Sequence, residues 1–369
     1  MRVLALSSYP DEAAATRFRV TQFIDPLRDR GVELIVSPFL DSKGFAQMYS
    51  RGRLLNKAVS MVKPVASRLM DIVQRGGCDL LFVQREAMMF GPPVFEWLYS
   101  RMSNVPLVLD LDDATYVRYV SPTYGRFASV LKFQGKTDAL IKRSAMVICG
   151  NRFIAEYVRS KERDATVIPT VVDLELFRPS VADNPGPTRI GWIGTPSTFP
   201  FLASLFPVLE RLAKTHRFVL KIVGSGLSQI AIPGVETELV DWALDREIDD
   251  FRSLDLGLYP ITTSVSANEQ WIMGKSGFKA IQYMAVGVPF VMTPVGVGAE
   301  LGKHGSTHFN ASSENDWYNS LNALLDSPEL RARMGEAARS YAEANFDLGT
   351  QADLLAAGFR SVLSTRGKQ

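Results

Sequence analysis

The fold of this chain is constrained most by an alternation of short apolar runs, rich in Val, Ile and Leu, with longer amphipathic runs. In the first half, the short runs cover residues 3–6, 32–36, 80–83, 107–109 and 146–148. The longer runs cover residues 17–30, 94–101 and 126–144. Short apolar runs are typical of strands that are buried on both faces, and the longer runs have the period of helices. The alternation therefore predicts a mostly parallel sheet with helices on both faces.

The alternation stops at residues 166–187, which are rich in Pro, Gly and Asn, and then resumes. The second series consists of predicted strands at 189–193, 218–223, 255–259 and 289–292, and predicted helices at 201–214, 313–325 and 328–345. We therefore predict two Rossmann-like, doubly wound α/β domains that face each other across a cleft, with ligands at the carboxyl ends of the strands. The first domain covers residues 1–170 and the second covers 180–346. A final helix at 349–365 is expected to pack back on the first domain.

Composition excludes several other classes of protein. With 369 residues, of which 46% are hydrophobic and 22% charged, the chain can bury a core without disulfides or zinc. Its two cysteines, Cys78 and Cys149, exclude a disulfide framework and indicate a reducing compartment. No run of about 18 apolar residues is present, and the apolar start of the chain is too short for a signal peptide. We expect a cytoplasmic protein, and a formal net charge of +2 argues against a nucleic-acid partner.

Positive charge is concentrated in the first half of the chain. Residues 1–180 hold 25 Lys and Arg against 19 Asp and Glu, whereas residues 181–369 hold 16 against 20. Within the first half, residues 43–70 carry six basic and no acidic side chains, with apolar residues between them. Such a segment can make peripheral contact with an anionic membrane, or it can form the solvated face of an ordinary core helix.

In the second half of the chain, two predicted strands are each followed directly by a glycine. Gly194 follows the strand at 189–193, and Thr195 and Ser197 precede the next predicted helix. Exposed N–H groups at a helix N-terminus can hold a phosphate, although the hydroxyls also fit an ordinary helix cap. Gly224 closes the strand at 218–223 in a similar way.

A second glycine-rich loop, at residues 274–277, leads into a short predicted helix. Lys275 precedes the helix, Ser276 and Gly277 begin it, and Lys279 lies in its first turn. A lysine at this place can reach a diphosphate whose other oxygens meet backbone N–H groups, or it can be an ordinary surface lysine. The segment is not a P-loop, because position 269, where that motif requires glycine, is Glu.

Three carboxylates, Asp110, Asp112 and Asp113, follow the predicted strand at 107–109. Crowded carboxylates are unfavourable unless they bind a cation, share a proton or face water. The group can therefore be a metal-binding D-x-D motif for a nucleotide sugar, a base or acceptor for substrate hydroxyls, or a helix cap.

Several segments resemble two-domain, GT-B-type glycosyltransferases. Residues 167–173, Val-Ile-Pro-Thr-Val-Val-Asp, are similar to the interdomain segment of these enzymes, and residues 191–198 to their donor-phosphate loop. Residues 275–289 resemble the E-x7-E region of the retaining family-four enzymes (glycosyl transferases group 1), in the variant with Gln in place of the second Glu. Residues 293–296, Thr-Pro-Val-Gly, and 83–86, Val-Gln-Arg-Glu, also match this subgroup. The resemblance covers nearly the whole chain, and residues 275–296 are its most specific part.

The resemblance implies transfer of a sugar from a nucleotide diphosphate sugar to a glycan or lipid-linked acceptor, with retention of configuration and without a metal. Gln282 stands where many members carry the second Glu, which holds the ribose, and Gly274 stands at the place of the first. Asp112 falls where many members carry a His near the reacting carbon, which favours a substrate-facing role for Asp112 over a metal ligand. The predicted donor-binding residues are Gly194, Thr195, Ser197, Gly224, Lys275, Ser276, Gly277, Phe278, Lys279 and Gln282. The predicted acceptor-binding residues are Arg17, Arg19 and Arg85, and the predicted catalytic residues are Asp112 and Lys275.

Two other functions are compatible with the same fold. A nucleotide-sugar epimerase would have the donor contacts but no acceptor. A sugar-nucleotide-binding protein without catalysis is suggested by Gly274 at the place of the first Glu.

Overall fold

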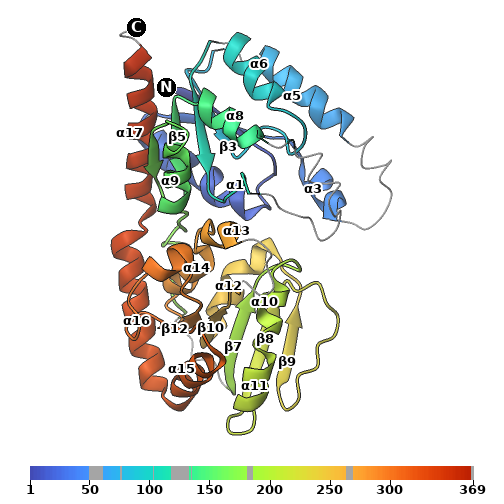
Figure 1. Cartoon of the computed structure of the whole chain (residues 1–369), viewed down its shortest axis with the longest axis vertical. Coiled ribbons are helices and arrows are strands. Elements are labelled where there is room, and N and C mark those ends of the chain that lie inside the picture. Colours follow the sequence, from blue (N-terminus) through green and yellow to red (C-terminus); the bar gives the residue numbers. More distant parts are fainter. Residues whose placement is uncertain are drawn as a thin grey trace. The chain divides into compact units, whose positions relative to one another are not determined.

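The chain forms two compact units (Figure 1), of which the computed structural model describes residues 1–49, 61–74, 77–102, 104–117, 133, 135–180, 186–262 and 269–366. Unit 1 contains Met1–Thr170 and Leu348–Gln369, and unit 2 contains Val171–Asp347. The chain therefore leaves unit 1 once and returns to it with its last helix. The predicted helix at 126–144 and the basic segment at 43–70 lie partly outside the described residues.

The described strands of unit 1 form one parallel six-stranded sheet of order β2-β1-β3-β4-β5-β6. The strands are β1 (Arg2–Ser7), β2 (Glu33–Pro38), β3 (Leu80–Gln84), β4 (Leu107–Leu111), β5 (Met146–Cys149) and β6 (Ala165–Val167). The central strands β1, β3 and β4 are buried along almost their whole length, as the apolar runs predict. The direction of strand order reverses between β1 and β3, which is where ligands of such sheets bind.

Helices cover the sheet of unit 1. They are α1 (Ala14–Arg19), α2 (Ile24–Asp29), α3 (Ser42–Tyr49), α5 (Val62–Gln74), α6 (Val94–Met102), α8 (Lys136–Arg143), α9 (Arg152–Arg159) and α17 (Leu348–Arg366). The last helix, α17, packs on this unit although it follows unit 2 in sequence. Its Asp353 accepts a hydrogen bond from Arg30 Nε at 2.7 Å, and the ring of its Phe359 lies edge-on to Phe82 of β3.

The described strands of unit 2 form a second parallel sheet of order β12-β11-β10-β7-β8-β9. The strands are β7 (Thr188–Ile193), β8 (Phe218–Val223), β9 (Glu236–Val240), β10 (Leu256–Tyr259), β11 (Phe290–Met292) and β12 (Phe309–Asn310). Its helices are α10 (Phe199–Ala203), α11 (Phe206–Leu212), α12 (Glu247–Arg252), α13 (Glu269–Met273), α14 (Phe278–Ala285), α15 (Glu314–Asp326) and α16 (Pro328–Asn345). Strand order reverses between β7 and β10, so the loop after β7 lies at the switch point of this sheet.

Two helices that the sequence predicts as continuous are broken, and prolines explain both breaks. Residues 17–30 form α1, a short 3-10 turn at Thr21–Phe23 and then α2. Residues 201–214 form α10 and α11. Pro26 lies in the first turn of α2 and Pro207 in the first turn of α11. Because proline lacks an N–H and is tolerated only in the first turn, each helix starts anew at its proline.

No helix among the described residues is long and apolar enough to cross a membrane.

Candidate functional site

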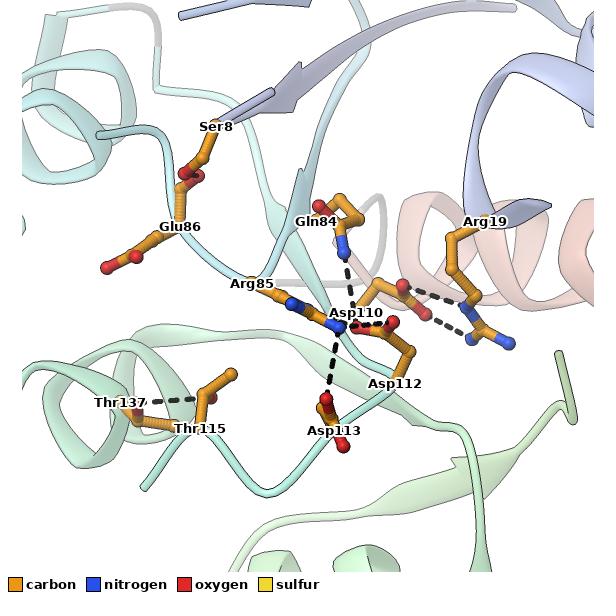
Figure 2. A network of polar contacts seen from close by, with 10 residues as sticks. All are labelled: Ser8, Arg19, Gln84, Arg85, Glu86, Asp110, Asp112, Asp113, Thr115 and Thr137. Atoms are coloured by element: carbon orange, nitrogen blue, oxygen red, sulfur yellow. Dashed lines mark hydrogen bonds and ion pairs between the residues drawn. The ribbon is translucent and has the colours of Figure 1, made fainter. Parts of the chain in front are cut away.

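In unit 1, polar side chains from the ends of three strands form one network, which Figure 2 shows. Arg85 directly follows β3, Asp112 and Asp113 follow β4, and Ser8 follows β1. The Ser8 hydroxyl donates to the carbonyl of Glu86 at 2.9 Å, which ties the loops after β1 and β3 together. The network therefore lies where the strand order of this sheet reverses.

Arg85 and Asp112 form the centre of this network. Arg85 Nε donates to Asp112 Oδ1 at 2.5 Å and Arg85 Nη2 to Asp112 Oδ2 at 2.7 Å, which makes the pair bidentate. Arg85 Nη2 also reaches Asp113 Oδ2 at 3.4 Å. Gln84 Nε2, at the end of β3, donates to Asp112 Oδ1 at 3.1 Å. The guanidinium of Arg85 is thus fixed between the two carboxylates.

The backbone of Arg85 is unusual, because its φ of 60° lies in the left-handed region that non-glycine residues rarely occupy. Such strain is typical of positions where a side chain must point in a fixed direction. Side-chain exposure is 24% for Arg85 and 30% for Asp113, but 9% for Asp112. Of Arg85, Asp112 and Asp113, Asp112 is therefore the least accessible to solvent.

Electrostatics keeps Asp112 ionised. Burial alone would raise the pKa of its carboxyl, but the adjacent Arg85 guanidinium, together with Arg19 and a backbone hydrogen bond, holds the pKa below its ordinary value. A carboxylate with a lowered pKa is a weak base. The base-like role predicted for Asp112 therefore loses support, whereas an orienting role, exerted through Arg85, is consistent with the geometry.

A second ion pair, between α1 and β4, is buried. Arg19, on α1, forms a bidentate pair with Asp110 of β4, with Nε donating to Oδ2 at 3.0 Å and Nη2 to Oδ1. Its Nη1 donates to the carbonyl of Ile168 at 2.7 Å. The side chains of Arg19 and Asp110 are 2% and 1% exposed. We therefore assign Arg19 a structural role in place of the predicted contact with an acceptor.

The predicted acceptor residue Arg17 lies on the same helix but is half-buried. Its Nη1 donates to the carbonyls of Asp11 and Glu12 at 2.9 and 3.3 Å. Arg17 thus fixes the loop between β1 and α1.

The carboxylates of the predicted D-x-D motif are paired with arginine side chains. Asp110 is paired with Arg19 and Asp112 with Arg85, so each carboxylate is already neutralised by a guanidinium. Within the part of the chain that the structure describes, no three His, Cys, Asp or Glu side chains are grouped as a metal site requires. His304 and His308 lie in the loop before β12, where His304 Nδ1 accepts from the backbone N–H of Asn310.

In unit 2, two predicted donor residues bring the ends of β7 and β8 into close contact. A Cβ on Gly224 would lie 2.4 Å from the carbonyl oxygen of Gly194, and the φ of Gly224 is +80°. The N–H of Gly194 donates to the carbonyl of Val223 at 3.1 Å. Thr195 and Ser197 are exposed beyond this contact, with their hydroxyls 2.9 Å apart. The following helix, α10, has only five residues, so the phosphate-binding effect expected of a helix dipole is weak here.

We expect Gly224→Ala to lower the free energy of unfolding by about 2–3 kcal/mol, because it adds a backbone clash to the strain of a left-handed conformation. Gly305→Ala is the matched control. The φ of Gly305 is +78° and no atom lies within 4 Å of its added Cβ, so only about 1 kcal/mol of strain is expected. Urea denaturation measures both variants. Equal losses would show that the contact between the two loops does not require glycine.

The predicted lysines lie around the start of α14. Gly277, with a φ of +65°, caps the helix and follows Ser276, and Phe278 is its first residue. Lys275 Nζ lies 3.6 Å from the centre of the Trp271 ring, and Lys279 Nζ lies 5.1 Å from that of Phe251. Such contacts between a cation and an aromatic ring stabilise the ammonium charge.

Gln282 does not reach solvent. It is fully buried, and its Oε1 accepts from Lys279 Nζ at 2.8 Å while its Nε2 lies 3.4 Å from Glu247 Oε1. Gln282 therefore orients Lys279, and the ribose contact predicted for it loses support. Glu247, at the start of α12, is a buried member of this group that the sequence did not indicate, because it lies 35 residues from Gln282.

No protein-family model matches the sequence, and a search of curated proteins finds no relative. Solved structures do match. HepE from Anabaena in complex with UDP-glucose is 17% identical, with a TM-score of 0.68 over 98% of this chain and 100% of that chain. Sucrose-phosphate synthase from Thermosynechococcus elongatus is 13% identical, with a TM-score of 0.68 over 99% and 100%. A glycosyltransferase from Rickettsia africae is 14% identical, with a TM-score of 0.68 over 98% of each chain.

Similarity at this level of identity establishes the fold. The predicted fold class is confirmed, since each unit is a doubly wound, Rossmann-like α/β domain and the two together match the GT-B architecture of glycosyltransferases.

Proposed function

We propose that the protein is a glycosyltransferase that moves a sugar from a nucleotide diphosphate sugar to a glycan or lipid-linked acceptor, with retention of configuration. Two observations carry the proposal: the loops after β7 and β8 meet in a close contact that has room only for glycine at positions 194 and 224, and two lysines, Lys275 and Lys279, lie around the start of α14. HepE, a structural neighbour, is described in complex with UDP-glucose, which supports a nucleotide sugar as the donor. The sequence motif at 275–296 supports the retaining family-four assignment and a hexosyl donor.

In this proposal, unit 2 holds the donor. The bond between the anomeric carbon and the diphosphate oxygen breaks, and the acceptor oxygen forms the new bond on the same face of the sugar. The acceptor proton passes to the departing diphosphate oxygen, so no protein nucleophile is required. The main task of the protein is to stabilise the charge that grows on the diphosphate, and we assign this task to Lys275 and Lys279.

Unit 1 would hold the acceptor at Arg85 and Asp113. Arg85 together with Asp112 and Asp113 has a net charge of −1, so the network does not favour an anionic group on the acceptor. Guanidinium and carboxylate groups held in fixed directions instead suit the hydroxyls of a sugar, which both donate and accept hydrogen bonds. We therefore propose that the acceptor presents uncharged sugar hydroxyls to this network.

We expect the reaction to proceed without a divalent cation, because lysines neutralise the diphosphate and arginines neutralise Asp110 and Asp112. Turnover in EDTA equal to turnover in Mg²⁺ or Mn²⁺ is the predicted result. Loss of turnover in EDTA, with rescue by either cation, would contradict this part of the proposal.

Lys275→Ala is expected to weaken binding of a nucleoside diphosphate by about 10- to 100-fold, the usual effect of losing a charge-assisted hydrogen bond of about 1.5–3 kcal/mol. Binding of the corresponding nucleoside should change little. Isothermal titration of both ligands measures the difference, after a thermal-shift screen of nucleotide diphosphate sugars has identified the base. Lys303→Ala, at an exposed lysine of the same unit, is the control. Equal losses for nucleoside and nucleoside diphosphate would place the phosphate contact elsewhere.

A further inference from the structure

Two neighbouring helices of unit 1, α5 and α6, turn apolar side chains outward. On α5, Val62, Leu69 and Met70 are 67%, 45% and 53% exposed. On α6, Val94, Trp97 and Met102 are 48%, 38% and 61% exposed. Eleven large apolar side chains are exposed among the described residues, and these two helices carry six of them. The exposed apolar surface is therefore concentrated in one place, which we name the α5–α6 face.

Helix α5 has an exposed apolar stripe. Val62, Ala66, Leu69 and Met70 are spaced i, i+4, i+7 and i+8, so they form one apolar stripe, and all four are exposed. Arg68 is 1% exposed and donates to the carbonyls of Ser37 and Ser7 at 2.8 and 2.9 Å. The helix thus buries Arg68, packs Val65 against the core and exposes an apolar stripe.

The second helix also exposes apolar side chains, although it buries Phe95 and Tyr99 in the core. Val94, Trp97 and Arg101 follow one another at i, i+3 and i+7 on the exposed side of α6. Its only acidic residue, Glu96, is buried and accepts from the N–H of Ala87 at 2.8 Å. The two helices are in contact and lie side by side in Figure 1, and we infer that their exposed stripes belong to one face.

The charges on this face are positive. Lys63 has an 88% exposed side chain, and the Arg101 guanidinium lies 5.5 Å from the centre of the Trp97 ring. The acidic side chains of the two helices are withdrawn, since Glu96 is buried and Asp71 is 13% exposed and bonded to Ser37. Asp41, at the start of α3, lies 4.0 Å from Lys63, and an exposed pair at that distance is weak.

We propose that the α5–α6 face docks on an anionic membrane surface. Apolar side chains enter the boundary between headgroups and acyl chains, Trp97 lies at that boundary, and Lys63 and Arg101 extend to the phosphates. Within the predicted basic segment 43–70, residues 62–70 belong to α5. The sequence analysis does not indicate a contribution from α6. The inference does not depend on the proposed transferase activity.

The test uses the full chain and co-sedimentation with two kinds of vesicle, one of phosphatidylcholine alone and one with equal parts of phosphatidylglycerol. We expect binding to the anionic vesicles to exceed binding to the neutral ones by about 30-fold, since each of two basic residues contributes about fivefold near such a surface. Arg101→Gln should lower binding by about fivefold. Raised salt should weaken binding to the anionic vesicles.

The apolar contribution is tested with the double variant Leu69→Ser and Met70→Ser, which should lower binding by about tenfold or more. Leu354→Ser on α17 is the matched control, because Leu354 is 45% exposed, as Leu69 is, and should leave binding unchanged. Both changes lie on exposed surface, so unchanged thermal unfolding verifies the fold. Vesicles with brominated acyl chains should quench Trp fluorescence, and Trp97→Phe should remove most of that quenching.

Three results would overturn the proposal. The first is equal binding to anionic and neutral vesicles, and the second is equal losses in the double variant and the Leu354→Ser control. The third is that the unchanged chain binds neither kind of vesicle but associates with itself, and that the double variant abolishes this self-association. That result would assign the α5–α6 face to a second copy of the chain.

Discussion

Asp110→Asn is expected to lower the free energy of unfolding by about 3–5 kcal/mol, the usual effect of removing one partner of a buried ion pair. The change leaves the Arg19 guanidinium, which is 2% exposed, without its charge partner in the core of unit 1. Urea denaturation followed by circular dichroism measures the loss.

Two further variants separate the buried charge from a general effect of substitution. Asp25→Asn removes a partner of Arg28 in an exposed pair and should change stability by less than about 1 kcal/mol. The double variant Arg19→Met and Asp110→Leu removes both charges and should recover most of the loss. An equal loss in Asp25→Asn, or no recovery in the double variant, would contradict the role assigned to this pair.

Asp112→Asn is expected to lower turnover by about 100-fold or more, because displacing a group that positions the reactants commonly lowers the reaction rate by such a factor. The substitution removes the charge that holds Arg85 in its bidentate pair, so the guanidinium loses its fixed direction. Binding of the donor should remain within about twofold, because the predicted diphosphate contacts lie in unit 2. Initial rates at saturating donor, together with titration of the nucleoside diphosphate, measure the two effects.

The neighbouring carboxylate is the control. Asp113 contacts Arg85 at 3.4 Å and is more exposed than Asp112, so Asp113→Asn should reduce turnover less. Since the pKa of Asp112 lies below its ordinary value of about 3.9, this group should produce no limb in the pH–rate profile between about pH 5 and 8. A limb in that range that disappears in Asp112→Asn would identify Asp112 as a general base.

Most of the fold could be predicted because its central strands are short, apolar and buried on both faces. The strands β1, β3, β4, β7 and β8 all follow this pattern, and each lies within a residue or two of its predicted position. The edge strands β6, β9 and β12 were missed for a physical reason. An edge strand needs less apolar surface, and β9 reads Glu-Thr-Glu-Leu-Val while β12 has two residues.

The candidate site was harder to predict because its contacts join residues far apart in the sequence. The alternation of strands places the segments after β3 and β4 at one edge, so the neighbourhood of Arg85 and Asp112 follows from the pattern. Nothing local indicates that Arg19 is buried, since its partner Asp110 lies 91 residues away. Nothing local indicates that Gln282 is buried either, because its contacts include Glu247, which is distant in the sequence, as well as Lys279.

The central claim is sugar transfer from a nucleotide diphosphate sugar, and product analysis with and without acceptor tests it most directly. The donor is the nucleotide sugar that gives the largest thermal shift, the acceptors are a panel of simple glycosides, and NMR identifies the products. We predict release of nucleoside diphosphate only when an acceptor is present, and a new glycosidic bond with the anomeric configuration of the donor. Conversion of the nucleotide sugar to an isomer in the absence of acceptor would contradict the claim and identify an epimerase. Binding of the nucleotide sugar without any product would also contradict it and identify a sugar-nucleotide-binding protein.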